Sequence, residues 1–188
     1  MIRSFILYKA ASLFRRGSHA KCTRGDLIPS TLCRAYESLN QSLLYDPKAI
    51  ELVNSVDYDF SVLDAQLDPV IRLASVARAL QCDRALKAYI GNHPRASVID
   101  LGAGLDTGFY RVDNGLIEWY DLDLLNVIAL RRQLLSTPDR VHSIPKSLLD
   151  ISSCDDLVDT GDGVCAVAGA VLGYFGEAQV KKTVFGAC

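Results

Sequence analysis

Residues 98–108 read Val-Ile-Asp-Leu-Gly-Ala-Gly-Leu-Asp-Thr-Gly, an apolar run that passes directly into a glycine-rich turn. Glycine lets the backbone approach a ligand closely, because no Cβ stands in the way. A second apolar run, Ile117–Asp123, ends 21 residues after Gly102. In a doubly wound sheet, an acid at this position faces the ribose of a bound nucleoside and accepts hydrogen bonds from its hydroxyl groups. The two runs therefore predict a nucleoside-binding crevice at the ends of two parallel strands.

The surrounding pattern predicts an α/β fold. Apolar residues at helical spacing run from Asp26 to about residue 92, and Asp46-Pro47 marks a helix start. Further elements are expected as follows: a long helix over Val70–Ile90, strands over Ser97–Leu101, Ile117–Asp123, Val141–Ile144 and Val164–Val171, and helices over Leu124–Leu135 and from Gly176 onward. Because strands that alternate with helices form parallel sheets, we expect a Rossmann-like, mostly parallel, incomplete sheet of four strands with an N-terminal helical lid.

Charge is distributed unevenly along the chain. Residues 1–25 hold six basic side chains and no acidic one, whereas residues 26–188 hold 14 basic and 22 acidic residues. We expect three parts: a basic N-terminal extension (1–25), the helical lid (26–95) and a partial cofactor-binding domain (96–188). Because the extension is basic, free of acid and carries scattered apolar residues, it suits either an amphipathic targeting peptide or an ordinary N-terminal helix.

The composition is that of a folded globular chain, with 49% hydrophobic and 22% charged residues. The net charge of −2 argues against a nucleic-acid binder held by bulk electrostatics. No run of 18 apolar residues occurs, so no membrane-spanning helix is expected. The six cysteines and three histidines are scattered without zinc-ligand spacing. This indicates reduced, mostly buried thiols in a cytoplasmic protein and no metal site.

Two cofactor classes use a glycine turn of this kind. A dinucleotide needs G-x-G-x-x-G, because its pyrophosphate sits on the following helix N-terminus. Here the third glycine, Gly108, is one place late, and Asp106 stands where the anionic pyrophosphate would lie. S-Adenosylmethionine has no phosphate and carries a sulfonium and an ammonium, so an acidic turn favours it. Its carboxylate needs a cation, for which Arg78 is the candidate. A tight turn without a ligand, and a solvated helix arginine at 78, stay open as alternatives.

The motif Leu-Gly-Ala-Gly-Leu-Asp-Thr at 101–107 resembles the glycine motif of the leucine carboxyl methyltransferase family, which includes the tetracenomycin-type polyketide O-methyltransferases. Further matches extend over about residues 27–185: Asp46-Pro47-Lys48-Ala49, Arg78 with Asp83, Phe109-Tyr110-Arg111, residues 118–135 and Val171-Leu172-Gly173-Tyr174-Phe175. The resemblance implies a class I methyltransferase sheet of strand order 3-2-1-4-5-7-6, with S-adenosylmethionine as the cofactor.

The resemblance also implies which residues contact the cofactor. They are Arg34 from the N-terminal helical region, Arg78, Gly102, Gly104, Asp106, Asp123, Ser147 and Leu148. Arg78 would bind the carboxylate, Gly102 would lie under the methionyl part and Asp123 would bind the ribose. Ser147-Leu148 fall where the family has an Asp-Leu pair beside the adenine. No catalytic side chain is assigned, because methyl transfer to oxygen relies on positioning and desolvation and needs no covalent protein intermediate.

Three departures from the family pattern stand out. Gly169 replaces a glutamate on the fourth strand, Ser147 replaces the adenine-side aspartate, and the sequence stops at Cys188, before strands 5, 7 and 6. Residues 164–175 are nearly all apolar or glycine, so an uncovered fourth strand would be a poor sheet edge. Three explanations stay open: a second chain covers this edge by self-association, the fold is marginal, or the chain is a truncated remnant.

We therefore expect an S-adenosylmethionine-dependent O-methyltransferase that acts on a carboxylate or hydroxyl of a small molecule or peptide, with no nucleic-acid or membrane partner. A first alternative is a truncated, non-catalytic methyltransferase-like fragment or interaction module. A second is a nicotinamide-binding Rossmann protein, which rests on the glycine turn alone.

Overall fold

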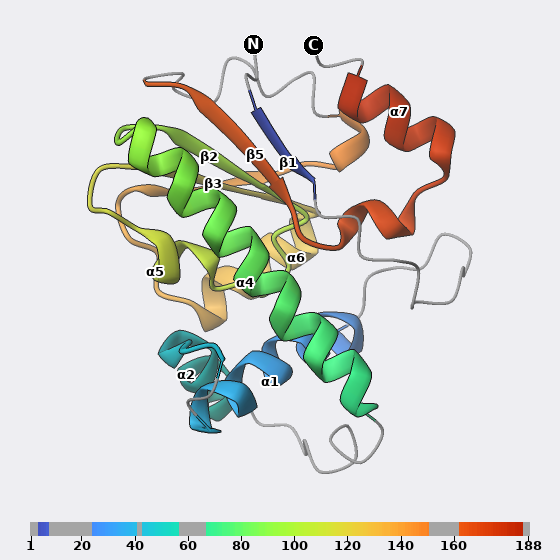
Figure 1. Ribbon diagram of the computed structural model, residues 1–188. Helices are drawn as coiled ribbons and strands as arrows, with labels where there is room; N and C mark the ends of the chain where they lie inside the picture. The colour runs from blue at the N-terminus through green and yellow to red at the C-terminus, as the bar shows by residue number, and fades with distance from the viewer. Residues whose placement is uncertain (1–3, 8–23, 41–42, 57–66, 151–161, 186–188) are drawn as a thin grey trace.

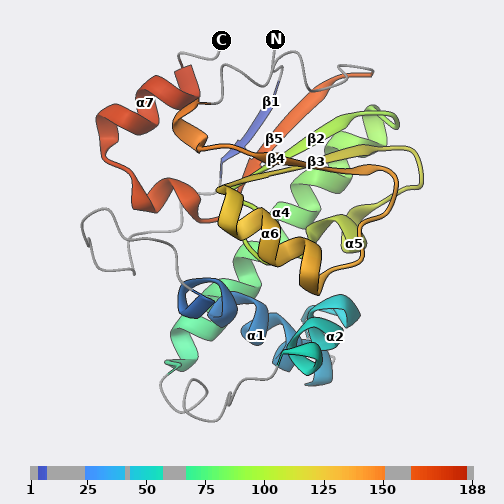
Figure 2. The same cartoon turned by 180° about the vertical axis from the view of Figure 1, so that it is seen from behind.

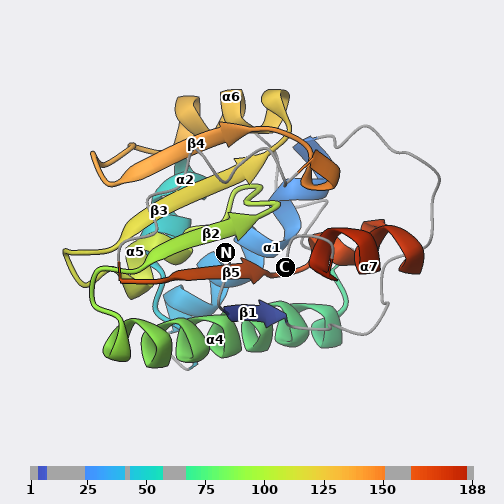
Figure 3. The ribbon, with the colours of Figure 1, turned by 90° about the horizontal axis from the view of Figure 1, so that it is seen from above.

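The computed structural model describes residues 4–7, 24–40, 43–56, 67–150 and 162–185 of the 188 residues. Within these residues, five parallel strands form a sheet in the order β1-β5-β2-β3-β4 (Figure 1). The strands are β1 (Ser4–Leu7), β2 (Ser97–Leu101), β3 (Glu118–Asp123), β4 (Val141–Pro145) and β5 (Val164–Ala168). Their arrows run the same way, so their carboxyl ends share one edge of the sheet (Figure 3). The α/β fold class is confirmed.

Five of the described α-helices come before β4 in the sequence. The described helices are α1 (Arg24–Asn40), α2 (Pro47–Ser55), α4 (Pro69–Asn92), α5 (Gly108–Val112), α6 (Leu125–Leu134), the 3-10 helix η2 (Val171–Tyr174) and α7 (Glu177–Phe185). The long helix α4 runs along the sheet and continues beyond it to pack against α1, with α2 beside α1 (Figures 1 and 2). From here on, the helical lid means α1 and α2 with the first half of α4.

Local signals in the sequence explain where the lid helices begin and end. Asp46 caps α2 by accepting a hydrogen bond from Ala49 N on its Oδ1, at 3.0 Å, and Pro47 is the first helical residue. Helix α4 ends at Asn92, shortly before Pro94, which cannot continue a helix. These starts and stops confirm the sequence prediction.

Apolar side chains lie on both faces of the sheet, because alternate residues of a strand point to opposite faces. One face packs against α4 and α5 through Cys82, Leu86, Ile90, Val98, Phe109, Val112, Ile117, Trp119, Cys165 and Val167. The other face carries Ile99, Leu101, Tyr120, Leu122, Ile144, Val164, Ala166 and Ala168, against which Leu148, Val171, Leu172 and Phe175 pack. The candidate site lies at the carboxyl ends of β2, β3 and β4, which carry residues of these two clusters.

The neighbour of β5 corrects one expectation. The fourth predicted strand is not a sheet edge, because Ser4–Leu7 pairs with it in parallel, from Ser4 opposite Cys165 to Leu7 opposite Ala168. The apolar-rich tetrapeptide Ser-Phe-Ile-Leu of the basic segment supplies the missing neighbour. A second chain therefore cannot pair with this edge of β5, because β1 already forms hydrogen bonds with it. The position is the one that the resemblance assigns to a fifth strand.

Two further differences concern boundaries. Strand β5 ends at Ala168, earlier than expected. The chain leaves the extended conformation there, and the 3-10 helix η2 begins at Val171. Residues 4–7 of the predicted N-terminal extension belong to the sheet. The predicted domain bounds, 26–95 for a helical lid and 96–188 for a cofactor-binding domain, stay predictions.

Three features bear on the expected class of protein. Within the described residues, no helix is both long and apolar enough to cross a bilayer. Cys33, Cys82 and Cys165 are buried free thiols. Burial raises the pKa of Cys82 and of Cys165 to about 12, so both stay protonated at neutral pH. In the same part of the chain, no group of three or more His, Cys, Asp or Glu side chains is arranged to hold a metal ion.

Candidate functional site

The glycine turn after β2 is tied to the end of β3. Gly102 and Gly104 have φ angles of +69° and +49°, which side chains with a Cβ rarely adopt. The amides of Gly102 and Ala103 donate to Leu122 O at 2.8 and 3.2 Å. The amide of Gly104 donates to Asp123 Oδ2 at 2.8 Å. The structure therefore places Asp123 against the glycine turn, as the spacing of the two in the sequence predicted.

Asp123 lies partly buried at the carboxyl end of β3. Besides Gly104 N, which donates to Oδ2, the amide of Leu124 donates to Oδ1 at 2.7 Å. Burial raises the pKa of Asp123, and the two amide hydrogen bonds partly offset that rise. Each carboxylate oxygen keeps a further lone pair. The side chain can therefore still accept hydrogen bonds from a pair of hydroxyl groups.

Arg78 lies partly buried on α4. Among the described residues it forms no hydrogen bond or ion pair. Burial lowers the pKa of Arg78, and the charge of Asp106 partly offsets this effect. A partly buried guanidinium with this freedom suits an incoming carboxylate. Both side chains interact with the glycine turn, Arg78 through the charge of Asp106 and Asp123 through its hydrogen bond from Gly104 N.

Asp106 keeps a negative charge at the turn. Its Oδ1 accepts a hydrogen bond from Thr107 N at 2.8 Å and lies 3.3 Å from Arg34 Nη2 and 3.6 Å from Arg111 Nη2. Burial alone raises the pKa of Asp106, but the two guanidiniums and the amide outweigh it and hold the pKa well below its usual range. The side chain is 37% exposed. An ionised carboxylate therefore faces any ligand that approaches the turn.

Arg34 has partners within the protein. It is 3% exposed, its Nε donates to Asp46 Oδ2 at 3.2 Å, and its Nη2 donates to Leu105 O at 3.2 Å. These contacts hold the side chain against the backbone of the turn. The direct cofactor contact of Arg34 that the resemblance implies stays a prediction.

Ser147 and Leu148 follow β4, next to the strand that ends in Asp123. In the sheet register Pro145 lies opposite Asp123, so these two residues come just past the same edge. Leu148 is buried in the apolar cluster of the sheet, and Ser147 Oγ accepts a hydrogen bond from Leu149 N at 3.2 Å. Both residues therefore lie just past the carboxyl edge of the sheet, and their adenine-side location stays a prediction.

The side chain that holds the turn in shape, Arg131, was not predicted from the sequence. Arg131 of α6 donates from Nη1 to three carbonyl oxygens of the turn, those of Ala103 (3.3 Å), Gly104 (2.9 Å) and Asp106 (2.9 Å). Its Nε and Nη2 donate to Asp121 Oδ2 at 3.1 and 2.6 Å. The signal that could have found Arg131 is Asp121, an acid inside a buried strand, because a buried carboxylate needs a cation.

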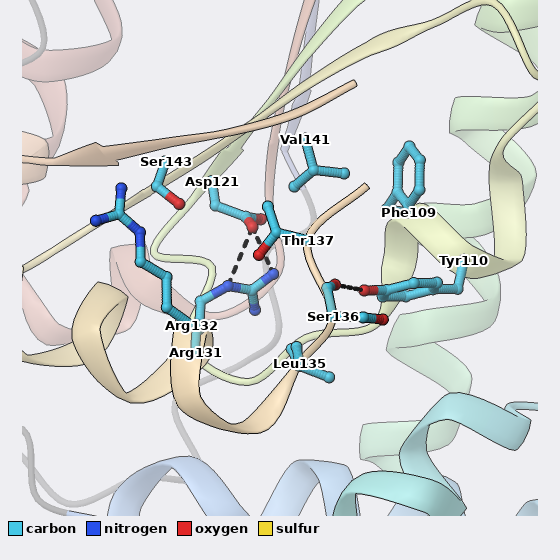
Figure 4. Close-up of a pocket in the computed structure, with 10 residues that line it drawn as sticks. All are labelled: Phe109, Tyr110, Asp121, Arg131, Arg132, Leu135, Ser136, Thr137, Val141 and Ser143. Carbon is cyan, nitrogen blue, oxygen red and sulfur yellow. Dashed lines mark hydrogen bonds and ion pairs between the residues drawn. The ribbon is translucent and has the colours of Figure 1, made fainter. Parts of the chain in front are cut away.

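A shallow pocket lies beside Arg131 (Figure 4). It is lined by Phe109, Tyr110, Asp121, Arg131, Arg132, Leu135, Ser136, Thr137, Val141 and Ser143. The pocket offers room for about one water molecule. None of the eight residues that the resemblance implies lines it. This pocket is therefore separate from the candidate cofactor site.

The comparisons with known proteins cover the residues of the candidate site. A model of the leucine carboxyl methyltransferase family matches residues 28–156, a span that includes the glycine turn, Asp123 and β4. The chain belongs to this family. It is also similar to the tetracenomycin polyketide synthesis O-methyltransferase TcmP of Streptomyces glaucescens, at 34% identity over 137 residues. The match covers 71% of this chain and 48% of TcmP, so the chain spans about half the length of that relative.

The structure explains one of two unusual glycines of this leucine carboxyl methyltransferase family member and leaves the other without a structural reason. A Cβ at Gly108 would lie 3.1 Å from Asp106 Oδ2 and 3.5 Å from the Trp119 ring, so close packing explains this glycine without a phosphate. A Cβ at Gly169 would meet nothing within 4 Å. Room for the family's glutamate exists there, and nothing in the structure explains its absence.

Replacement of Asp100 by Asn is expected to stabilise the folded protein at neutral pH. Asp100 is 5% exposed and lies opposite Asp121 in the register of β2 and β3. Burial, together with the charges of Asp106 and Asp121, raises its pKa well above the usual range. The folded chain thus retains a proton that the unfolded chain releases above about pH 4, which lowers stability as pH rises toward the folded-state pKa.

Urea unfolding at pH 7.5 and pH 4.5 measures this effect. Asp100→Asn should raise the unfolding midpoint at pH 7.5, and the gain should shrink at pH 4.5, where the native carboxyl is already neutral. Asp139→Asn, at an exposed carboxyl, is the control. A gain of the same size at both pH values would contradict the assigned cause.

Proposed function

We propose that this chain binds S-adenosylmethionine at the glycine turn and supplies the cofactor-binding part of an O-methyltransferase. The observation that carries the proposal is the 2.8 Å hydrogen bond from Gly104 N to Asp123 Oδ2. It joins a turn with positive φ angles to a carboxylate that suits the ribose diol. Membership of the leucine carboxyl methyltransferase family supports the choice of this cofactor over a dinucleotide.

The charges around the turn fit the charged groups of S-adenosylmethionine. The ionised and partly exposed Asp106 favours the sulfonium and ammonium, and it opposes an anionic pyrophosphate. Arg78 suits the cofactor carboxylate, because it forms no hydrogen bond or ion pair among the described residues. Ser147 and Leu148 suit the adenine, because they follow β4 just past the edge that carries Asp123.

The chain's own contribution to the reaction is positioning. When bound, S-adenosylmethionine supplies a methyl group on a positively charged sulfur. Asp123 and Arg78 would hold the two ends of the cofactor, and the apolar clusters around the turn would keep water away from it. The acceptor is an oxygen of a small molecule or peptide. Similarity to TcmP, a polyketide O-methyltransferase by name, supports a small molecule as the first acceptor to test.

Calorimetric titration of the 188-residue chain with S-adenosylhomocysteine, the demethylated cofactor, tests the proposal. The unchanged chain should bind it. Asp123→Ala should weaken binding about 10- to 100-fold, because a hydrogen bond to a charged group contributes roughly 1.5–3 kcal/mol. In the same titration, Arg78→Met should weaken binding, whereas Arg84→Met, at an exposed position of the same helix, should not.

Asp139→Ala removes an exposed carboxyl and is the matched control for Asp123→Ala. Absence of binding by the unchanged chain, or equal binding by Asp123→Ala and Asp139→Ala, would overturn the proposal. Enhancement of NADH fluorescence by the chain would instead favour the nicotinamide alternative. Transfer of a labelled methyl group to small molecules in a lysate would argue against a non-catalytic fragment.

A further inference from the structure

The lid is fastened to the glycine turn by a buried group of polar side chains. We call this group the lid latch: Thr31 and Arg34 of α1, Asp46 at the start of α2, and Thr107 and Arg111 beside the turn. Thr31, Arg34, Asp46 and Thr107 are each at most 3% exposed. The latch joins segments that lie more than 60 residues apart in the sequence.

Asp46 is the centre of the lid latch. It is fully buried, and its Oδ1 caps α2. Its Oδ2 accepts hydrogen bonds from Arg34 Nε (3.2 Å), Thr107 Oγ1 (2.6 Å) and Arg111 Nη1 (2.7 Å). A single carboxylate therefore connects α1, α2 and the residue that follows Asp106. Removal of its charge leaves two buried guanidiniums short of a partner.

Helix α1 also reaches the backbone of the turn directly. Thr31 Oγ1 and Arg34 Nη2 both donate to Leu105 O, at 3.1 and 3.2 Å. The side chain of Leu105 is buried against Leu52 of α2. One residue of the glycine turn is thus held by hydrogen bonds from α1 and by apolar contact with α2.

Arg111 extends the lid latch to the long helix. Its Nε and Nη2 donate to the two oxygens of Asp83 on α4, at 2.7 and 3.0 Å, in a bidentate pair. Its Nη1 donates to Asp46 and to Thr107 Oγ1. The turn can change shape only if contacts to α1, α2 and α4 change with it.

We propose that Asp46, Arg34 and Thr31 are positioning residues that couple the docking of the lid helices to the ligand-binding shape of the glycine turn. The inference rests on the proposed function, since the ligand is S-adenosylmethionine. Coupling of this kind is reciprocal: a docked lid raises affinity for the cofactor, and bound cofactor stabilises the docked lid. Arg34 thus serves the cofactor through the turn.

Amide hydrogen exchange and calorimetry with S-adenosylhomocysteine test the coupling. In the unchanged chain, saturating ligand should slow exchange in α1 and α2. Asp46→Asn keeps an N-cap oxygen for α2 but removes the charge. It should weaken ligand binding at least tenfold, and ligand should no longer slow exchange in the lid helices. Glu51→Gln, at an exposed position of α2, is the control and should behave like the unchanged chain.

Thr31→Val gives a milder test, because it keeps the shape of the side chain and removes only the hydrogen bonds of Thr31 Oγ1, which donates to Leu105 O and accepts from Arg34 Nη2. It should weaken binding two- to fivefold and reduce the ligand-induced protection, which keeps the proposal testable if Asp46→Asn does not fold. Equal affinity and equal lid protection in Thr31→Val, Glu51→Gln and the unchanged chain would overturn the lid latch alone. Absence of binding in the unchanged chain and in Glu51→Gln would overturn the proposed function as well.

Discussion

Replacement of Arg131 by Met is expected to lower the free energy of unfolding by about 3–5 kcal/mol, the range for breaking a buried ion pair from one side. Arg131 is 7% exposed, and its guanidinium pairs with Asp121 at 2.6 Å. Without it, the carboxyls of Asp121 and Asp100 face each other across β2 and β3 with no nearby cation from α6. Three carbonyl oxygens of the glycine turn also lose their donor.

Urea unfolding followed by circular dichroism measures this loss. Arg132→Met is the matched control, because it removes the same side chain from an exposed position of the same helix. The control should stay within about 0.5 kcal/mol of the unchanged chain, as surface substitutions do. A difference below about 1 kcal/mol between the two variants would contradict the role assigned to Arg131.

Replacement of Gly102 by Ala is expected to cost about 2–5 kcal/mol of stability. The φ angle of +69° adds about 1–2 kcal/mol of strain for a residue with a Cβ. The new Cβ would also lie 2.4 Å from Val171 Cβ, and overpacking of this kind costs about 1–3 kcal/mol. The site therefore requires glycine because η2 packs against the turn.

Thermal and urea unfolding of Gly102→Ala measure the cost. Gly91→Ala is the control, because a Cβ there meets nothing within 4 Å and the residue lies in the last turn of α4. Since alanine favours helix over glycine by up to about 1 kcal/mol, the control should be neutral or slightly stabilised. Equal stability of Gly102→Ala and Gly91→Ala would show that Val171 moves away at little cost.

The sequence predicted that the glycine turn and Asp123 lie together, because the signals for both are local. The glycine turn follows a strand, and the acid that ends the next strand comes at the expected distance, so Gly104 and Asp123 meet. The internal contacts of Arg34 were not predicted in this way. Its side chain donates to Asp46 and to Leu105 O, whereas the cofactor contact that the resemblance implies stays a prediction. A basic residue on a helix gives no sign, in the sequence, of which carboxylate or carbonyl it will meet.

The sequence by itself determined the α/β class, the strands β2 to β5 and the glycine turn that follows β2. Each follows from short-range rules: alternation of strands and helices, helix caps and the position of glycine. Tertiary structure alone decided that Ser4–Leu7 pairs with β5 and that Arg131 holds the turn. It also decided that Asp46 joins the lid to that turn. These contacts link residues that are distant along the chain. Burial and charge decide which residues pair, and only the folded structure defines both.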